Sequence, residues 1–344
     1  MVPRAYRAVA FVIGLFVVVQ LGAVALVPEF TESGYQAVEN PDDPTNSLVY
    51  ILAILVMTAL LLAAFRYDFD RAVRLLIVGV SAWLSWYVFA AIVPPLVAAI
   101  PAVAVAVGLL VHPEWYVIDT AGVLMGAGAA GLFGITFGLL PALILLVFLA
   151  VYDAISVYGT EHMLSLAEGV MDLNIPVVLV IPLSLSYSLL DDDFAGAADV
   201  HEDAAGAAGE VEDAAGEADE AEVAADGDEV SDGDGVSDAP EDGSRDAFFI
   251  GLGDAVIPAV LVASAATFSP APMLSVPLIG LNLPALFAMI GIVAGLLVLM
   301  SWVMKGRAHA GLPLLNGGAI GGYLIGSLVA GVPLVDALGL AAFV

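Results

Sequence analysis

Two aspartates lie inside long apolar stretches of the sequence, and they are the residues best placed to do chemistry. Asp153 and Asp254 are each flanked on both sides by uncharged, largely apolar residues. An ionisable side chain within a membrane-spanning segment is costly, so by default it marks a functional site that faces a bundle interior or a water-filled cavity. Asp119 and Asp336 lie closer to the ends of apolar stretches, where we expect hydrated carboxylates.

The two central carboxylates are predicted to reach the same depth in the membrane. Asp153 lies eight residues before Glu161, and Asp254 lies eight residues after Asp246. At the rise of an α-helix, each lies about 12 Å from the nearest charged end. The stretch with Asp153 leaves the membrane on the side from which the stretch with Asp254 enters. We therefore expect a carboxylate pair on consecutive antiparallel helices.

Such a pair supplies an acid and a base together. Two carboxylates in one site cannot both ionise cheaply, so they share a proton and titrate as a unit. The ionised member can activate a water molecule while the protonated member polarises a carbonyl group, which is the arrangement used by aspartic proteases in general. The residues leave open which aspartate plays which part.

The neighbours of both aspartates admit a functional and a purely structural interpretation. Gly251, Leu252 and Gly253 directly precede Asp254, and glycine permits close helix approach or a local departure from regular helix, although it is also common in ordinary membrane helix packing. Tyr152 precedes Asp153. Its ring could line the site, or it could pack near the bilayer interface.

The composition places these residues in a membrane protein. Hydrophobic residues make up 61% of the chain and charged residues 13%, and the mean hydropathy is +1.01, so most of the chain lies in lipid. Since one span requires roughly 17 to 25 apolar residues, the sequence predicts an all-α polytopic membrane protein with nine transmembrane helices. They are expected near residues 8–27, 47–65, 75–93, 96–111, 117–135, 139–159, 247–268, 281–303 and 316–342.

The basic residues give this arrangement an orientation. Cytoplasmic loops retain Lys and Arg, whereas translocated loops do not. Nine crossings put all eight bases on one side of the membrane, namely Arg4, Arg7, Arg66, Arg71, Arg74, Arg245, Lys305 and Arg307. We therefore expect a cytoplasmic N-terminus, an external C-terminus and an integral protein of the cell membrane.

An acidic segment divides the apolar chain into two parts. Residues 191–246 hold 22 of the 37 acidic residues and are otherwise rich in Ala and Gly, so they cannot bury enough apolar surface to order themselves. We expect residues 1–190 to carry membrane helices 1 to 6, residues 191–246 to form a disordered cytoplasmic linker, and residues 247–344 to carry helices 7 to 9. On the same orientation, the whole stretch 160–246 is a cytoplasmic loop.

Three motifs make the chain resemble the presenilin family of intramembrane aspartyl proteases, particularly its archaeal homologues. They are Tyr152-Asp153, the Gly-Leu-Gly-Asp of residues 251–254 and the Leu-Pro-Leu-Leu-Asn-Gly-Gly of residues 312–318. The resemblance implies the presenilin-like GxGD protease fold, with the aspartates of the first two motifs as the catalytic pair. In the third motif, Pro313, Leu314 and Leu315 stand where the family has Pro-Ala-Leu, so the middle Ala is replaced. In the family this region shapes the active site and contacts substrate.

The resemblance also implies a substrate class. Signal peptide peptidases share the motifs but have the opposite orientation in the membrane, so the charge pattern favours the presenilin orientation. In the family this orientation goes with transmembrane segments of type I membrane proteins as substrates. Archaeal homologues are single-chain enzymes. Nothing in the sequence names an accessory subunit, and a homo-oligomer stays open.

Other classes of site and function fit less well. The chain has no cysteine, which excludes thiol catalysis and disulfides, and we find neither a His-Glu-x-x-His zinc motif nor a serine nucleophile motif with a histidine. The histidines His112, His162, His201 and His309 lack ligand spacing. We expect no metal, no cofactor and no nucleic acid. A proton-coupled or ion-coupled transporter that uses the same carboxylates is the main alternative.

Cleavage within a membrane requires the substrate helix to unwind, because a helix hides its carbonyl groups in its own hydrogen bonds. An edge strand could replace the lost partners. We consider two places for such a strand: the apolar run 177–181 and the residues beside Pro313. A short buried helix is the alternative for the run 177–181.

Overall fold

The computed structural model describes residues 4–67, 69–159, 177–183, 187–189, 247–275, 279–304 and 310–341. The acidic segment 191–246 lies outside the described residues. So do three of the eight basic residues, Arg245, Lys305 and Arg307, and three of the four histidines. The predicted linker therefore lies outside the described residues.

Most of the described chain is helical. The helices are α1 (Arg4–Glu32), α2 (Thr45–Arg66), α3 (Asp70–Ala90), α4 (Pro95–Val111), α5 (Trp115–Thr136), α6 (Leu139–Gly159), α9 (Leu252–Phe268), α10 (Leu283–Val303), α11 (Gly311–Val329) and α12 (Leu334–Ala337). Within the described residues, seven helices are long and apolar enough to cross a membrane, while the apolar helices α4 and α9 are shorter, at 17 residues each. The molecule is thus an integral membrane protein.

Two predicted helices differ from the structure. The stretch 247–268 begins as a strand, β2 (Ala247–Gly251), which pairs antiparallel with β1 (Val178–Pro182), and α9 starts only at Leu252. A short apolar run rich in Phe and Ile suits a strand as well as a helix. The same pairing makes Val178–Pro182 a strand, so the alternative of a short buried helix for the run 177–181 was wrong.

The last predicted span, 316–342, is also shifted. Helix α11 begins five residues earlier, at Gly311, and ends at Val329. Gly331 follows with φ of 76°, and the N–H of Val332 bonds back to the carbonyl of Ser327. A left-handed glycine with such a back-bond terminates a helix, and Pro333 is the N-cap of the short α12.

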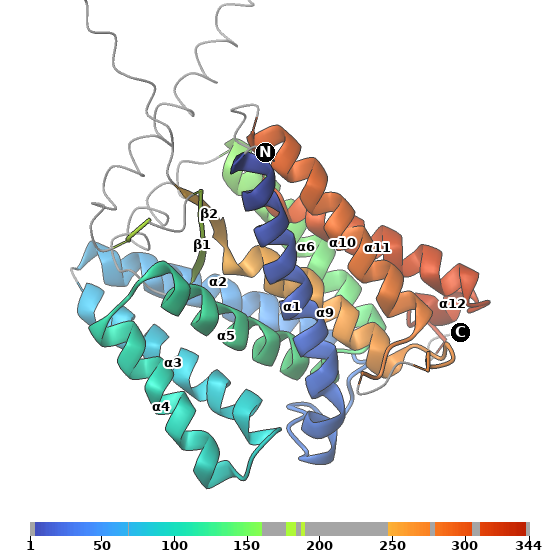
Figure 1. Cartoon of the computed structure of the whole chain (residues 1–344). Coiled ribbons are helices and arrows are strands. Elements are labelled where there is room, and N and C mark those ends of the chain that lie inside the picture. Colours follow the sequence, from blue (N-terminus) through green and yellow to red (C-terminus); the bar gives the residue numbers. More distant parts are fainter. Residues whose placement is uncertain are drawn as a thin grey trace, which may run out of the picture.

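Helix α9 lies at the centre of the bundle. Figure 1 shows α3 and α4 at one side and α10 and α11 at the other, with α1, α5 and α9 between them. Most of α9 is buried, and it packs against α5, α1, α10, α11 and α6. It also contains Pro258, four residues after Asp254. The helix that carries one of the two candidate aspartates is therefore enclosed by the rest of the protein.

Helices α10 and α11 touch through their backbones. A Cβ atom added at Gly318 would lie 2.2 Å from the carbonyl oxygen of Gly291, and one at Gly295 would lie 2.5 Å from the carbonyl oxygen of Leu314. Gly322 approaches Phe287 in the same way. Small residues at four-residue spacing allow this approach, so α11 is held in a fixed position along its first three turns.

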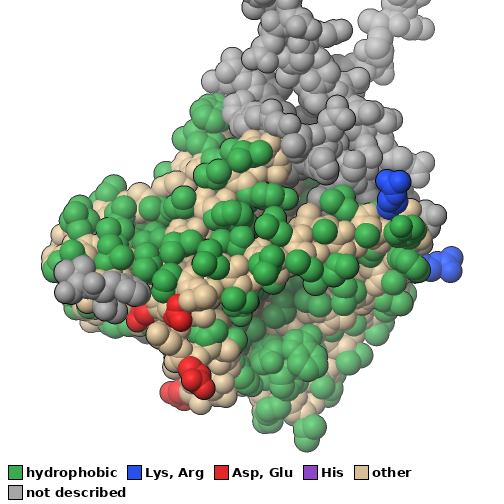
Figure 2. All heavy atoms as spheres, turned by 180° about the vertical axis from the view of Figure 1, so that it is seen from behind, with side chains coloured by type: hydrophobic (Ala, Val, Ile, Leu, Met, Phe, Trp, Pro, Cys, Tyr) green, Lys and Arg blue, Asp and Glu red, His purple; other side chains and the backbone are tan. Residues whose placement is uncertain are grey.

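Helix α2 is the opposite case, because much of its surface is exposed. Leu48, Leu52 and Leu60 are each about 60% exposed. Its attachments include a hydrogen bond of 2.7 Å from the Ser47 hydroxyl to the carbonyl of Pro141 and the ring of Tyr50, which packs on two phenylalanines. Near its C-terminal end, Leu61 and Phe65 pack against Val73 of α3. Figure 2 shows hydrophobic side chains over most of one face of the molecule, with acidic side chains at its lower end and basic ones at its upper right, as suits a surface in lipid.

Candidate active site

Asp153 lies near the C-terminal end of α6 and is buried, with 7% of its surface exposed. Its Oδ2 accepts a hydrogen bond of 3.1 Å from the backbone N–H of Leu312, in the first turn of α11. Residues 153 and 312 are 159 positions apart in the chain. The third predicted motif therefore meets the first one through its backbone.

Asp254 lies in the first turn of α9, three residues after the end of β2. Its carboxylate faces Gly311, since a Cβ atom added at Gly311 would lie 3.0 Å from Asp254 Oδ2 and 3.4 Å from Oδ1. Gly311 and Leu312 are consecutive residues, and the first faces Asp254 while the second bonds to Asp153. The structure thus brings the two predicted aspartates, on α6 and α9, to the same end of α11.

The beginning of α11 touches both acids. Residue 311 contacts Asp254, and residue 312 bonds to Asp153. The first N–H groups of a helix have no partner within it and carry a partial positive charge, which favours a nearby carboxylate. Pro313 fits this first turn because its missing N–H is not needed there. Helix α11 therefore anchors the acid pair with its N-terminal end.

The remaining predicted site residues are distributed around this junction. Gly251 and Gly253 are exposed, whereas Leu252 is buried and belongs to the core. Leu315 is fully buried, and the carbonyl of Leu314 faces α10 at Gly295. Leu314 and Leu315 thus fix α11 in the bundle, while Leu312 and the preceding Gly311 approach the acids.

Tyr152 does not share the surroundings of its neighbour. It is 37% exposed, and its ring stacks on Phe148, one turn earlier on α6, with the ring centroids 6.4 Å apart. This geometry favours packing on the outer face of α6 over a role beside the carboxylates.

Three residues near the site were missed or misjudged from the sequence. Gly311 precedes the motif that was considered, and only its position two residues before Pro313 could have pointed to it. Asn316 is fully buried and donates a hydrogen bond of 2.9 Å to the carbonyl of Leu146, which ties α11 to α6. Asp119 was expected to be hydrated, but it is 4% exposed and bonds to the backbone of β1.

An apolar pocket of about 250 Å³ is lined in part by α9, the helix that carries Asp254. It is bounded by α2, α5, α6 and α9, and its lining comprises Tyr50, Ala53, Ile54, Met57, Phe133, Leu145, Val256, Ile257 and Val260. Val256 and Ile257 follow Asp254 within one turn of α9. An apolar side chain placed in this pocket would thus lie next to the helix that carries Asp254.

The described residues contain no group of three or more His, Cys, Asp or Glu side chains that could hold a metal ion. His112, the one histidine in the described part of the chain, is instead paired with the hydroxyl of Tyr116 at 2.9 Å. The chemistry that the described site offers is that of two carboxyl groups.

Comparisons with known proteins show the family of the chain. The family model described as signal-peptide peptidase, presenilin aspartyl protease matches residues 13–332. A solved presenilin family intramembrane aspartate protease, crystallised in space group C222, is 29% identical, with a TM-score of 0.60 over 93% of this chain and 99% of that one.

A second structure of such a protease, in space group P2, is 28% identical, with a TM-score of 0.54 over 92% of this chain and 97% of that one. No curated protein matches the chain significantly. Because the family model covers nearly the whole sequence, the chain belongs to the signal-peptide peptidase and presenilin aspartyl protease family and is an intramembrane aspartyl protease.

Proposed function

We propose that Asp153 and Asp254 are the catalytic pair of this protease and that its substrates are transmembrane segments of membrane proteins. The observation that carries the proposal is the meeting of the two carboxylates at the start of α11, where residues 311 and 312 contact one acid each. Two acids held this closely in a membrane bundle provide the shared proton that peptide hydrolysis by aspartates requires.

The reaction needs only water and the pair. The ionised carboxyl group takes a proton from water as the water oxygen attacks the scissile carbonyl carbon, and the protonated carboxyl group hydrogen-bonds the carbonyl oxygen as it becomes negative. The tetrahedral intermediate then collapses, the C–N bond breaks, and the leaving nitrogen receives a proton from the pair. One peptide bond and one water molecule yield a carboxylic acid and an amine.

The substrate must be extended where it is cut, because the carbonyl groups of a helix are already bonded. The β1–β2 sheet supports this requirement, since β2 runs directly into the helix that carries Asp254. An unwound segment lying along the sheet would have backbone partners on one side and the acids at its end. The apolar pocket beside Val256 and Ile257 offers room for one of its apolar side chains.

The membrane arrangement belongs to the same proposal. We infer nine spans, made by the seven long helices together with α4 and α9. A helix of 17 residues extends about 26 Å, which approaches the thickness of the hydrocarbon core. The charge pattern of the sequence supports a cytoplasmic N-terminus and an external C-terminus in the cell membrane, with residues 191–246 as a cytoplasmic linker between helices 1–6 and 7–9.

The transporter alternative is not favoured, because the family and the matched structures are proteases. Purified wild-type protein should cleave a transmembrane peptide in detergent or in liposomes. Asp153→Asn and Asp254→Asn should each reduce the rate by at least about a thousandfold, since neither variant leaves a complete acid–base pair. Mass spectrometry of the products measures the loss.

Asp336→Asn is the matched control, because Asp336 lies in α12 and away from the pair. It should cleave at the wild-type rate. Cleavage that persists in either pair variant, or proton-coupled transport that survives in both, would refute the assignment.

A further inference from the structure

The fold holds the two acids of the proposed pair in different ways. Asp254 lies on α9, which is enclosed by the rest of the bundle. Asp153 lies on α6, whose outer face is bare, since Val147, Val151 and Ile155 are each more than half exposed. The position of Asp153 therefore depends on what holds the inner face of α6.

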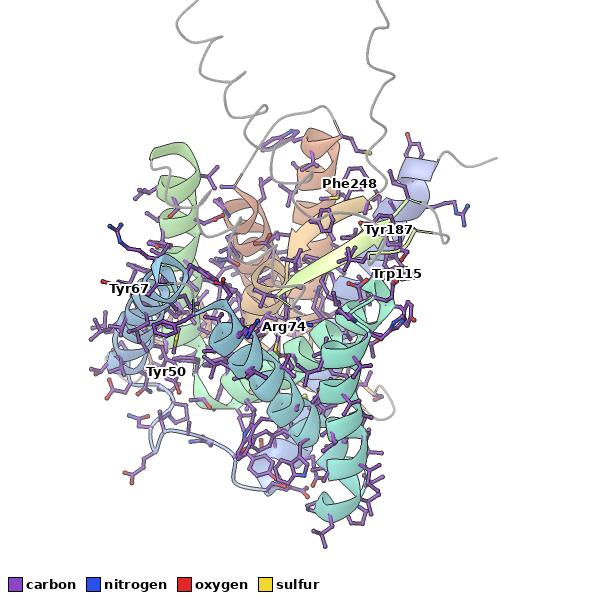
Figure 3. All side chains as sticks on the ribbon, turned by 90° about the vertical axis from the view of Figure 1, so that its left-hand side faces the viewer. Tyr50, Tyr67, Arg74, Trp115, Tyr187 and Phe248 are labelled. Atoms are coloured by element: carbon purple, nitrogen blue, oxygen red, sulfur yellow. The ribbon has the colours of Figure 1, made fainter. Side chains whose placement is uncertain are left out.

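The start of α9 is fixed by the sheet that precedes it. The N–H of Leu252 bonds to the carbonyl of Val177. The indole of Trp115, at the start of α5, donates to the carbonyl of Tyr187 in the segment after β1, and Figure 3 shows these two side chains near each other at one end of the sheet. These contacts hold Asp254 from the side of the sheet, where α6 takes no part.

Two hydrogen bonds join α6 to α11. The N–H of Leu312 donates to Asp153 at 3.1 Å, and the side-chain amide of Asn316 donates to the carbonyl of Leu146 at 2.9 Å. Asn316 follows Leu312 by four residues, and Leu146 precedes Asp153 by seven, so each pair shares one face of its helix. The Asn316 bond therefore lies one turn of α11 beyond the bond to the acid, along the same contact between the helices.

The backbone of Asn316 is held from both sides. The carbonyl of Leu314 lies against Gly295 of α10, and Gly318 lies against the carbonyl of Gly291. Residues two positions before and two positions after Asn316 are thus in backbone contact with α10. The side chain starts from a fixed point, and its hydrogen bond relates the position of α6 to the rigid pair α10 and α11.

Asn316 is an unfavourable choice for packing alone. It is fully buried, and its Oδ1 has no hydrogen-bond partner among the described residues. A buried acceptor without a partner destabilises a protein. The carbonyl of Leu146 lies inside α6, where it has a helical donor without Asn316. Since an apolar side chain would avoid the unpartnered oxygen and leave no other group unpaired, the bond is explained by what it positions rather than by stability.

We propose that Asn316 sets the register between α6 and α11 and so holds Asp153 at the N–H of Leu312. A single buried asparagine fixes the register of packed helices in coiled coils, at a cost in stability. The inference rests on the proposed protease function and deepens it, since the register decides whether Asp153 meets Asp254. Asn316 is a positioning residue and takes no part in the chemical step.

The test replaces the carboxamide by an apolar side chain of the same branching, in Asn316→Leu. Gln20→Leu is the matched control, because Gln20 is also a fully buried carboxamide, and neither its oxygen nor its nitrogen has a partner among the described residues. It lies on α1, which packs mainly on α5, α9 and α10. For each protein, kcat and KM are measured with the same transmembrane peptide, and the unfolding midpoint is measured in the same detergent.

Asn316→Leu should lower kcat about thirtyfold while KM stays within about twofold, because catalysis is sensitive to small displacements of the reacting groups. Its unfolding midpoint should be no lower than that of the wild type, since the unpartnered oxygen is gone. Gln20→Leu should also be no less stable, and it should cleave at the wild-type rate. A kcat of Asn316→Leu within about threefold of the wild type, or an equal loss in Gln20→Leu, would overturn the inference.

Asn316→Gln keeps the amide donor on a longer side chain. It should retain at least about a third of the wild-type rate, although the added methylene overpacks the site and lowers the unfolding midpoint. The Leu variant should therefore be the slower of the two and the Gln variant the less stable. Rates that follow stability across the three proteins would mean that Asn316 only packs, and an Asn316→Leu protein that does not fold would refute the inference as well.

Hydrogen exchange examines the contact with the acid directly. The peptide that contains Leu312 should exchange at least about fivefold faster in Asn316→Leu, because its N–H loses the carboxylate of Asp153, and at the wild-type rate in Gln20→Leu. Unchanged exchange in Asn316→Leu would count against the proposal. Wild-type protein that cleaves no peptide would instead reject the protease function, and the exchange measurement would then decide on the register by itself.

Discussion

Helices α10 and α11 are packed backbone against backbone, whereas α2 leaves much of its surface exposed and is attached only through side chains such as Ser47 and Tyr50. Both regions border the helix that carries Asp254, since α10 and α11 pack on one part of α9 and the apolar pocket separates α2 from another. This difference in packing separates two tasks. The rigid pair α10 and α11 holds the acids in place, whereas the loosely packed α2 forms a movable wall of the apolar pocket.

The strongest test of this difference is to force α10 and α11 apart. Gly318→Ala would place a methyl group 2.2 Å from the carbonyl oxygen of Gly291, and a backbone cannot move aside as a side chain can. We expect a loss of about 1–3 kcal/mol in stability and, because the start of α11 shifts, about a hundredfold in cleavage rate. Thermal unfolding in detergent and the peptide assay measure the two effects.

Gly317→Ala is the control for this variant, because a Cβ atom at Gly317 meets nothing within 4 Å. It should behave as the wild type. Equal damage from both substitutions would mean that helix propensity rather than the α10–α11 contact determines the outcome.

A smaller effect is expected where α11 meets the acids. Gly311→Ala places a methyl group 3.0 Å from Oδ2 of Asp254, so the carboxylate must move by a few tenths of an ångström. The rate should fall about tenfold with little change in unfolding temperature, because catalysis is sensitive to displacements that stability barely registers. A loss of stability as large as that of Gly318→Ala would contradict a local effect at the site.

The smallest effect is expected at α2. Ser47→Ala removes the hydrogen bond to Pro141, and such bonds between membrane helices contribute about 0.6 kcal/mol on average. The cleavage rate should stay within about twofold of the wild type, while the unfolding midpoint falls slightly. An inactive Ser47→Ala would show that α2 positions the acids as firmly as α11 does.

The sequence was sufficient to place the main elements and to select the aspartates. Apolar stretches of span length predicted the helices because lipid imposes one length and one polarity on them. Asp153 and Asp254 stood out because charge is rare in such stretches, and the structure places them close together. Their role in the reaction is still a prediction.

What the sequence could not give depends on contacts between distant segments. The strand at 247–251 was assigned to a helix, because only its pairing with β1 distinguishes the two. Asp119 was expected to be hydrated, because no residue near it in the sequence indicates that its carboxylate accepts a hydrogen bond from the N–H of Val180. The role of Gly311 depends on its contact with Asp254, which lies 57 positions earlier in the chain.

Pro258, inside α9, has a consequence for how the acid pair meets water. In a regular helix the N–H of residue 258 would bond to the carbonyl oxygen of Asp254, but proline has no N–H. That oxygen therefore lacks its helical donor, in the same residue as one carboxyl group of the proposed pair. Because lipid offers no hydrogen-bond donor, we expect the lone pairs of this oxygen to bind a water molecule, which is the reagent that hydrolysis consumes.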